Sequence, residues 1–364
     1  METKLKITEF IHEHREWEAR LAEAPYFIRT KRDEPYVLLK YEQYASDFTN
    51  PLVRECRGVI LDEENGYRPV CVPFFKFGNY GESYVPDIDW ATARVQEKID
   101  GSLIKLWYDR GAWRTSTNST VNAKNAASQN AYSEELTGIT FYDLFWEAWE
   151  NANGRLDRLD KGCTYLFELT SPRNRVIIRY EETGIWHIGT RDNQTLKEFE
   201  TDIGIRKPKE YPLRDLADVV AAAEKLSGDG EGFVVVDGHY SRVKVKSPRY
   251  VMLAHLLSGV STEKNILSLI LKGETEEFIT YFPEYANDID QMNRRFDSLV
   301  GELEKEAAAL RDLKFDSRKD MAAVVTKMKY PAFLFAVSDG KVASAREWLT
   351  TRPEEKVIAM LSAV

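Results

Sequence analysis

Short apolar runs separated by turn residues fill the chain from residue 34 to about residue 250. Runs of roughly four to eight residues, rich in Val, Ile, Thr and aromatic residues and bounded by Gly, Pro, Asn, Asp or Ser, are typical of β-strands. Helical patterns interrupt them at 126–151 and 213–226. This mixture predicts an α+β fold built on antiparallel sheets. The predicted strands are YVLLKY (36–41), GVILD (58–62), SLIKLWYD (102–109), CTYLFELT (163–170), RVIIRY (175–180), GIWHIGT (184–190), GFVVVDG (232–238) and RVKVKS (242–247).

The N-terminal segment has a helical pattern. Ile7, Phe10, Ile11, Trp17 and Leu21 recur at helical spacing among charged residues, which predicts an amphipathic helix. The segment carries acidic residues and lacks the apolar centre of a signal peptide. No apolar stretch in the chain approaches the roughly 20 residues that cross a bilayer. We therefore expect a cytoplasmic protein with no membrane partner.

The character of the chain changes after Ser247, because few strand-like runs follow. A chain of 364 residues is long enough for two domains. We therefore predict an α+β domain at 1–250 and an all-helical domain at 251–364. The helical spacing of the second domain is clearest at Met292, Phe296, Leu299, Val300, Leu303, Ala307, Leu310 and Leu313.

The composition limits the possible partners and metals. A formal net charge of -9 gives no general attraction to polyanions, so a nucleic-acid partner would need a local basic groove. The three cysteines, Cys56, Cys71 and Cys163, have no CxxC spacing. This pattern indicates reduced thiols and argues against a zinc site. Any metal is expected to be bound by oxygen.

The stretch EKIDGSL (97–103) places Lys98 just before an Asp-Gly turn. Taken alone, K-x-D-G most often marks a solvated lysine beside a hairpin turn. The alternative is a reactive amine at the mouth of a nucleotide site. Other stretches of the chain decide between the two.

The strand RVKVKS carries three cations at alternate positions. Alternation puts Arg242, Lys244 and Lys246 on one face and Val243 and Val245 on the other. Such a face is either an exposed edge strand protected by charge or a binding surface for phosphates. Both interpretations remain open from this strand alone.

Two carboxylates lie at apolar runs. Glu231 stands at the entrance to the strand GFVVV, and Glu168 lies inside TYLFELT. A carboxylate in such a place is costly unless it is paired, lies at a strand end, or faces a ligand or metal. Further upstream, Arg57 precedes an apolar strand, and Lys76 stands beside Phe77, whose ring is either core or a stacking surface.

Taken in order, these stretches resemble the covalent lysyl nucleotidyltransferases, which comprise ATP-dependent DNA ligases, RNA ligases and mRNA capping enzymes. KIDGS resembles the nucleotidyl-lysine motif, FEL the internal carboxylate motif, EGFVVV the fourth motif and VKVKS the fifth. Within the superfamily, ECRGVIL, KFGN and SPRNRVIIRY are similar to the phage RNA ligase 1 family. The resemblance covers about residues 35–250 and implies a nucleotidyltransferase domain, an ATP-grasp-like ligase domain, followed by an all-α domain.

The resemblance also implies the activity of an ATP-dependent RNA ligase, with ATP and Mg²⁺ required and Mn²⁺ as a substitute. Lys98 would become lysyl-AMP, AMP would move to an RNA 5′-phosphate, and a 3′-hydroxyl would displace AMP. The implied partner is RNA with such ends, single-stranded or a nicked tRNA loop, in RNA or tRNA repair. The implied protein is a monomer whose helical domain selects the RNA.

The site residues carry over from the family motifs position by position. The catalytic set is Lys98, Glu231, Lys244 and Lys246. Glu168 and Glu231 would hold the metal, and Phe77, Glu97 and Val245 are candidates for the wall against the adenine. The nucleotide-binding set is Arg57, Lys76, Phe77, Glu97, Asp100, Gly101, Glu168, Glu231, Lys244 and Lys246.

The implied chemistry sets a condition on Lys98. A lysine attacks a phosphate only as the neutral amine, yet its reference pKa is about 10.4. Desolvation and neighbouring cations lower such a pKa. Since the resemblance brings Lys244, Lys246 and Arg57 near the same phosphates, we expect the pKa of Lys98 to be lowered.

The chain departs from the family at one motif, and this leaves alternatives to weigh. Where the family often has a basic residue followed by Gly-Ser, this chain reads WRTSTNST, so Thr117, Asn118 and Ser119 occupy the region and their role is open. A DNA ligase or capping guanylyltransferase would carry a β-barrel nucleic-acid domain after the fifth motif, where this chain predicts helices. A non-catalytic RNA-binding protein on the same fold would not need the intact lysine and carboxylate motifs.

Overall fold

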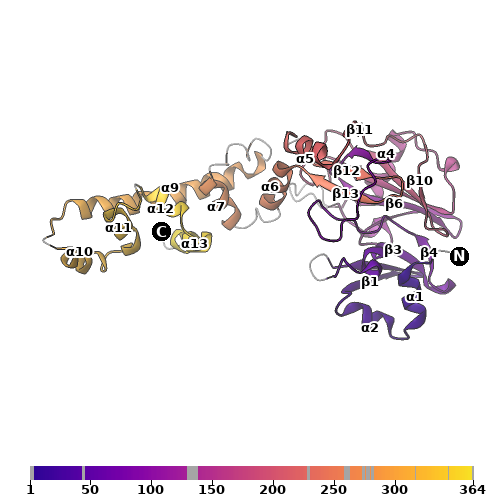
Figure 1. Ribbon diagram of the computed structural model, residues 1–364, viewed down its shortest axis with the longest axis horizontal. Helices are drawn as coiled ribbons and strands as arrows, with labels where there is room; N and C mark the ends of the chain where they lie inside the picture. The colour runs from indigo at the N-terminus through magenta and orange to yellow at the C-terminus, as the bar shows by residue number, and fades with distance from the viewer. Residues whose placement is uncertain are drawn as a thin grey trace. The chain divides into compact units, whose positions relative to one another are not determined.

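The computed structural model describes residues 4–42, 46–128, 138–227, 230–257, 263–272, 283–315, 317–342 and 344–362, together with Thr275 and Ile279. The chain forms two compact units, Met1–Val251 and Met252–Val364. Helix α6 (Pro248–Leu257) crosses this division (Figure 1). In the described residues, the strands lie in the first unit and the second contains helices, which confirms the α+β class.

The first unit is built on three sheets whose strands pair antiparallel. The first sheet has the order β1 (Ile28–Asp33), β2 (Tyr36–Tyr41), β3 (Arg57–Asp62), β4 (Arg68–Cys71). The second has the order β10 (Glu198–Phe199), β9 (Gly184–Asp192), β8 (Cys163–Thr170), β6 (Ser102–Asp109), β7 (Ala112–Thr117). The third has the order β11 (Glu210–Tyr211), β5 (Arg94–Glu97), β12 (Gly232–Val236), β13 (Arg242–Lys246).

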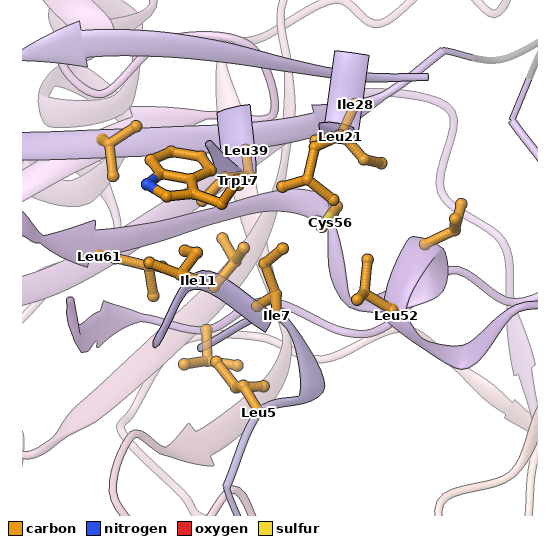
Figure 2. Packing of buried hydrophobic residues seen from close by; sticks show 14 residues of the cluster. Leu5, Ile7, Ile11, Trp17, Leu21, Ile28, Leu39, Leu52, Cys56 and Leu61 are labelled. Atoms are coloured by element: carbon orange, nitrogen blue, oxygen red, sulfur yellow. The ribbon is translucent and has the colours of Figure 1, made fainter. Parts of the chain in front are cut away.

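Five α-helices lie ahead of α6 in the described part of the first unit: α1 (Lys6–Glu13), α2 (Trp17–Ala22), α3 (Pro51–Glu55), α4 (Phe141–Asn151) and α5 (Leu216–Glu224). The predicted N-terminal helix is therefore two short helices, because the backbone at His14 is extended. The predicted apolar face is nevertheless buried. Figure 2 shows how side chains of α1 and α2 meet those of the first sheet and α3. This cluster includes Ile7, Ile11, Trp17, Leu21, Ile28, Leu39, Leu52, Cys56 and Leu61.

The predicted strands are present with one exception, the segment 175–180. This prediction was wrong because the backbone N–H groups of Ile177 and Ile178 donate to the carboxylate of Asp100, at 2.9 and 2.6 Å. Those donors are satisfied by a side chain and have no need of a neighbouring strand.

The helices predicted at 126–151 and 213–226 are shorter than expected. The first begins at Phe141, where Thr140 and Asp143 form a capping box, and Ala127 makes an isolated β-bridge to Thr140. Residues 129–137 of this prediction lie outside the described residues. The second spans Leu216–Glu224 and is capped by Asp215. Capping residues therefore set where both helices start.

The second unit contains α7 (Glu263–Lys272), α9 (Ala286–Arg311), α10 (Arg318–Val325), α11 (Pro331–Ser338), α12 (Ala345–Thr350) and α13 (Glu354–Leu361). Helices α7, α11, α12 and α13 contact α9. The predicted helical spacing is confirmed along α9, although Leu313 lies beyond its end and is exposed. No described helix is long and apolar enough to cross a membrane. The buried residues of α9 are Ile289, Met292, Phe296, Leu299, Leu303, Ala307 and Leu310.

Candidate active site

A cavity of about 290 Å³ lies between the second and third sheets of the first unit, and Lys98 lines it. We call it the lysine cavity. The strand register brings its walls together: on β12, Val234 pairs with Gln96 of β5 and Lys244 of β13. The predicted site residues in its lining are Arg57, Phe77, Glu97, Lys98, Gly101, Glu168, Glu231, Lys244 and Lys246. The lining also contains Phe74, Gln96, Ile99, Leu103, Asn118, Ile188, Pro208, Val234 and Arg242.

The backbone around Lys98 is tied to the third sheet and to β8. The Lys98 N–H donates to the carbonyl of Gly232 at 2.9 Å, so the lysine continues the edge of β5. Gly101 then passes so close to β8 that a Cβ there would collide with the carbonyl oxygen of Leu169. Glycine is needed at this position because of that close approach.

Asp100 lies outside the lysine cavity and holds the loop that carries Lys98. Its side chain is 3 % exposed and accepts hydrogen bonds from the backbone of Ile177 and Ile178. Its other oxygen accepts from the Tyr250 hydroxyl at 2.6 Å. The structure thus places Asp100 in a structural position, buried and fully engaged, behind Lys98.

Glu231 joins two lysines of the cavity. Its Oε2 lies 2.6 Å from Nζ of Lys98, and its Oε1 lies 3.5 Å from Nζ of Lys246. Glu231 is 3 % exposed, so the ion pair with Lys98 is shielded from water and the charge–charge interaction is strong. This geometry fixes the amine of Lys98 inside the cavity.

The expected lowering of the Lys98 pKa is wrong for the protein without ligands. Burial lowers this pKa, but the negative charges of Glu231 and Glu168 outweigh burial, so the pKa lies above its ordinary value. The motif order correctly predicted cations near Lys98, but the carboxylates of Glu231 and Glu168 have the larger effect on its amine. Lys98 is therefore protonated at neutral pH until the charge around it changes.

Lys244 is the lysine whose pKa is strongly lowered, to about 6, by burial and by the charges of Arg57, Lys76 and its other cationic neighbours. No carboxylate forms an ion pair with it in the described part of the chain. The alternation predicted for β13 is confirmed, because Lys244, Lys246 and Arg242 line the cavity. Val245 is buried in the opposite core, so its candidacy for the wall against the adenine was wrong. Lys244 is thus positioned to gain a proton when an anion enters.

One wall of the lysine cavity is apolar. Phe77 lies under three basic side chains, with Lys244 Nζ 4.6 Å, Arg57 Cζ 5.6 Å and Arg242 Cζ 6.0 Å from its ring centre. Phe74 and Leu103 form a small core cluster with Leu166, against which Phe77 packs. Arg57 also has a buried Nη1 without a hydrogen-bond partner among the described residues. An apolar wall beside basic side chains without ion-pair partners, Arg57 and Lys244, suits a ligand that carries both a flat ring and negative charge.

Glu168 is the carboxylate left without a direct partner. It accepts no hydrogen bond and forms no ion pair with the described residues, and burial raises its pKa to about 7. Glu231, the second carboxylate, also has a raised pKa because of burial. No group of three or more His, Cys, Asp or Glu ligands occurs in the described ranges. Two carboxylates fit Mg²⁺, which keeps several waters and binds one or two carboxylates plus substrate phosphates.

Lys76 lies in a neighbouring cavity and does not line the lysine cavity. Its ammonium sits over the rings of Phe48, at 5.0 Å, and Tyr41, at 5.9 Å. It is close enough to Arg57 and Lys246 for their charges to contribute to lowering its pKa, after burial. The structure therefore places Lys76 outside the lining of the lysine cavity, although its charge still acts on the basic side chains there.

Lys105 is a functional candidate that the sequence interpretation missed. It is 0 % exposed, in the middle of β6, and its Nζ donates to the carbonyl of Gly58. Gly58 has φ +82°, and a Cβ there would lie 2.7 Å from the carbonyl oxygen of Asn118. Arg57 and Asn118 both line the lysine cavity, so Lys105 supports two of its residues from behind. A charged residue inside the apolar run SLIKLWYD was the available signal.

Lys105 leads to a prediction about stability at alkaline pH. Burial lowers its pKa to about 8, whereas the unfolded chain keeps a value near 10.5. Between these values the unfolded state binds more protons, so the stability of the wild type should rise relative to Lys105→Met as pH increases. The gain should reach up to about 3 kcal/mol. Urea unfolding of both proteins at pH 7 and pH 10 measures this difference, and parallel pH profiles would contradict it.

Comparison with known proteins gives distant but consistent relatives. No protein-family model matches the chain. A protein of Autographa californica nuclear polyhedrosis virus, whose name describes a bifunctional polynucleotide kinase/RNA ligase, is 30% identical over 284 residues, 72% of this chain. The RNA ligase of Rhodothermus phage RM378 is 25% identical over 376 residues, 83% of this chain. Among solved structures, an archaeal ATP-dependent RNA ligase is 13% identical over 74% of this chain and 76% of its own, with a TM-score of 0.43.

These relatives differ in how much of them the chain covers. It spans 40% of the baculovirus protein and 85% of the phage protein. One relative comes from a baculovirus and the other from a bacteriophage, and both names contain RNA ligase. The chain is therefore a homologue of proteins named RNA ligase.

Proposed function

We propose that the chain is an ATP-dependent RNA ligase that joins a 5′-phosphate to a 3′-hydroxyl through lysyl-AMP and an adenylylated RNA end. One observation carries the proposal: the amine of Lys98 is fixed in a cavity that also holds two carboxylates, an apolar wall, and two basic side chains, Arg57 and Lys244, that form no ion pair with the described residues. A buried nucleophile, a phosphate-binding face and oxygen ligands for Mg²⁺ are the parts that nucleotidyl transfer needs. We infer that the polynucleotide is RNA because the names of the relatives contain RNA ligase.

In the first step, Nζ of Lys98 attacks the α-phosphorus of ATP, a P–N bond forms, and the bond to pyrophosphate breaks. Glu231 holds the amine in place before the attack. Lys244 and Lys246 lie on the same face of β13, where they can offset the charge of the departing pyrophosphate. Phe77 and its neighbours offer the surface against which a base stacks.

The amine must lose its proton before it attacks, since only the neutral form is nucleophilic. The carboxylates that raise the pKa of Lys98 in the free protein are Glu231 and Glu168. A Mg²⁺ ion held by these two residues, with Mn²⁺ as a substitute, would supply positive charge against both the carboxylates and the phosphates. The same residues then serve the remaining steps, in which AMP moves to the RNA 5′-phosphate and is displaced by the 3′-hydroxyl.

The test is ligation of a 5′-phosphorylated single-stranded RNA in the presence of ATP and Mg²⁺. We expect joined product and free AMP, and much less product from matched single-stranded DNA or a nicked DNA duplex. Preference for the nicked DNA duplex would contradict the proposal and indicate a DNA ligase. Binding of RNA without any transfer of AMP would favour a non-catalytic RNA-binding protein.

We propose that the second unit selects the RNA and adds little to nucleotide chemistry. The residues of the lysine cavity all lie between Arg57 and Lys246, within Met1–Val251. A truncated protein should keep α6, because Tyr250 holds Asp100. We expect residues 1–257 to form lysyl-AMP within about threefold of the full chain and to lose preference among structured RNAs. Circular dichroism checks folding first, and a folded truncation without lysyl-AMP would contradict this role.

The biological setting follows from the proposed reaction. Ends of this kind arise when RNA is cut, so we propose a role in RNA repair, with a nicked tRNA loop as a natural substrate. The reaction consumes ATP, and the three cysteines are free and buried, which fits a cytoplasmic enzyme. The proposed active form is a monomer, because the lysine cavity is complete within one chain. Joining of tRNA halves cut in the anticodon loop would test the substrate.

A further inference from the structure

A second cavity, of about 670 Å³, adjoins the lysine cavity in the first unit. We call it the arginine cavity. Its charged lining consists of Arg54, Lys76, Arg191, Lys197, Glu198 and Arg242. We propose that this cavity binds the sugar–phosphate backbone and bases of the RNA strand next to the end that is joined. This inference rests on the proposed function and adds a location for the polynucleotide.

The charge of the arginine cavity favours an anion. Among the described residues of its lining, five Lys and Arg side chains face a single carboxylate, Glu198. Glu198 pairs with both Arg191 and Arg242, the latter at 2.6 Å. Arg54 and Lys197 form no ion pair in the described ranges. A local excess of cations in a protein of net charge -9 is the kind of groove that a polyanion needs.

Arg191 indicates that the cavity is built for a ligand. It is 4 % exposed, and its guanidinium lies 4.2 Å from the ring centre of Phe75. Two of its nitrogens, Nε and Nη1, have no hydrogen-bond partner among the described residues. A buried guanidinium with unused donors is costly unless another acceptor satisfies them. A phosphate oxygen is a suitable acceptor because it carries charge.

Aromatic rings stand among these cations. Tyr84, Tyr240 and His239 line the arginine cavity, and His239 is exposed at its rim. The turn that carries His239 and Tyr240 is fixed by Asp237, whose Oδ1 accepts from the N–H groups of His239 and Ser241, both at 2.9 Å. Single-stranded RNA is held by cations along its backbone and by bases stacked on aromatic side chains. The lining therefore fits a single strand better than a simple anion.

The position of the arginine cavity connects it to the chemistry. Phe77 and Arg242 line both cavities, so a strand held in the arginine cavity ends beside the lysine cavity. The competing ligand is the triphosphate tail of ATP, which would also meet cations here. The two ligands are needed in different steps. The RNA strand is needed only after lysyl-AMP has formed, whereas the triphosphate tail of ATP is needed for lysyl-AMP to form.

The experiment measures both steps in the full-length chain. The variants are Arg54→Ala, Lys197→Ala and the double variant, and Lys225→Ala, an exposed lysine outside both cavities, is the matched control. Binding of a fluorescein-labelled, 5′-phosphorylated 12-nucleotide RNA is followed by anisotropy at several salt concentrations, without ATP or Mg²⁺. Formation of lysyl-AMP is followed separately with labelled ATP.

We expect the double variant to bind the RNA at least about tenfold more weakly. The slope of log Kd against log salt should fall by about 0.7 for each cation removed. Labelling with ATP should stay within twofold of the wild type, and Lys225→Ala should match the wild type in both assays. RNA binding that depends on these residues without any labelling of the wild type would refute the ligase and leave the RNA site standing.

Two outcomes would overturn the inference. Unchanged RNA affinity and salt slope in the double variant, with normal labelling, would show that the strand binds elsewhere while the ligase assignment survives. A parallel loss of labelling and RNA binding, in protein that unfolds at the same temperature as the wild type, would assign the arginine cavity to the triphosphate tail.

Discussion

Lys98→Ala should abolish covalent labelling of the protein by ATP carrying a radioactive α-phosphate, a loss of at least roughly 1,000-fold. The reason is that Lys98 is the lysine fixed by Glu231 within the lysine cavity, with its Nζ 2.6 Å from the carboxylate. Lys98→Arg should fail as completely, because a guanidinium keeps its proton at any usable pH and offers no neutral nucleophile. Denaturing gels of the labelled proteins measure the adduct.

The linkage itself provides an independent readout. A lysyl-AMP phosphoramidate is split by acid and survives alkali, which distinguishes it from an acyl phosphate. Lys225→Ala, an exposed lysine outside the cavity, controls for the loss of a lysine as such. An undiminished band in Lys98→Ala would remove Lys98 from the chemistry. Lys244 would then be the next candidate, since its pKa of about 6 makes it the other nucleophilic amine of the cavity.

Glu231→Gln and Glu168→Gln should each slow the formation of lysyl-AMP by at least roughly 100-fold at a fixed low Mg²⁺ concentration. Both substitutions keep the size of the side chain and remove the charge that a metal needs. Glu168 has no other partner among the described residues, so loss of its charge affects ligand binding more than folding. Glu231 also holds Lys98 and Lys246, so its loss leaves a buried ammonium without its carboxylate.

The role of Glu168 in metal binding and the additional role of Glu231 in holding the lysines can be separated by experiment. Raising Mg²⁺ should restore part of the activity of Glu168→Gln, because a weakened metal site is filled at higher concentration. Glu231→Gln should recover less, and its midpoint of thermal unfolding should fall. Glu224→Gln, on the exposed side of α5, is the matched control. Wild-type activity in excess chelator would disprove the role of a metal.

The sequence by itself determined those features that depend on local pattern. The alternation in RVKVKS placed Lys244 and Lys246 on one face, because successive side chains of a strand point to opposite sides. Runs of strand-forming residues located the strand that carries Glu168 and the strand that Glu231 precedes. They did not locate β5, whose edge Lys98 continues. The order of the motifs was enough to indicate the resemblance to RNA ligases, and the homologues of the chain carry that name. A charged residue in an apolar run was a usable signal for Glu168 and would have served for Lys105.

Tertiary structure alone decided which charges meet. The segment 175–180 has the pattern of a strand, but its backbone does not pair with one. Asp100, far earlier in the chain, accepts the hydrogen bonds of the Ile177 and Ile178 N–H groups. The same is true of the pKa of Lys98, which depends on how close Glu231 and Glu168 approach it in three dimensions.

The arginine cavity also arises only from the fold, because its lining comes from segments between Arg54 and Arg242 that no local pattern connects. Local sequence fixes which side chains share a strand face, since that follows from backbone periodicity. Distances between charges on different strands follow from packing of the whole unit, and those distances set protonation and binding.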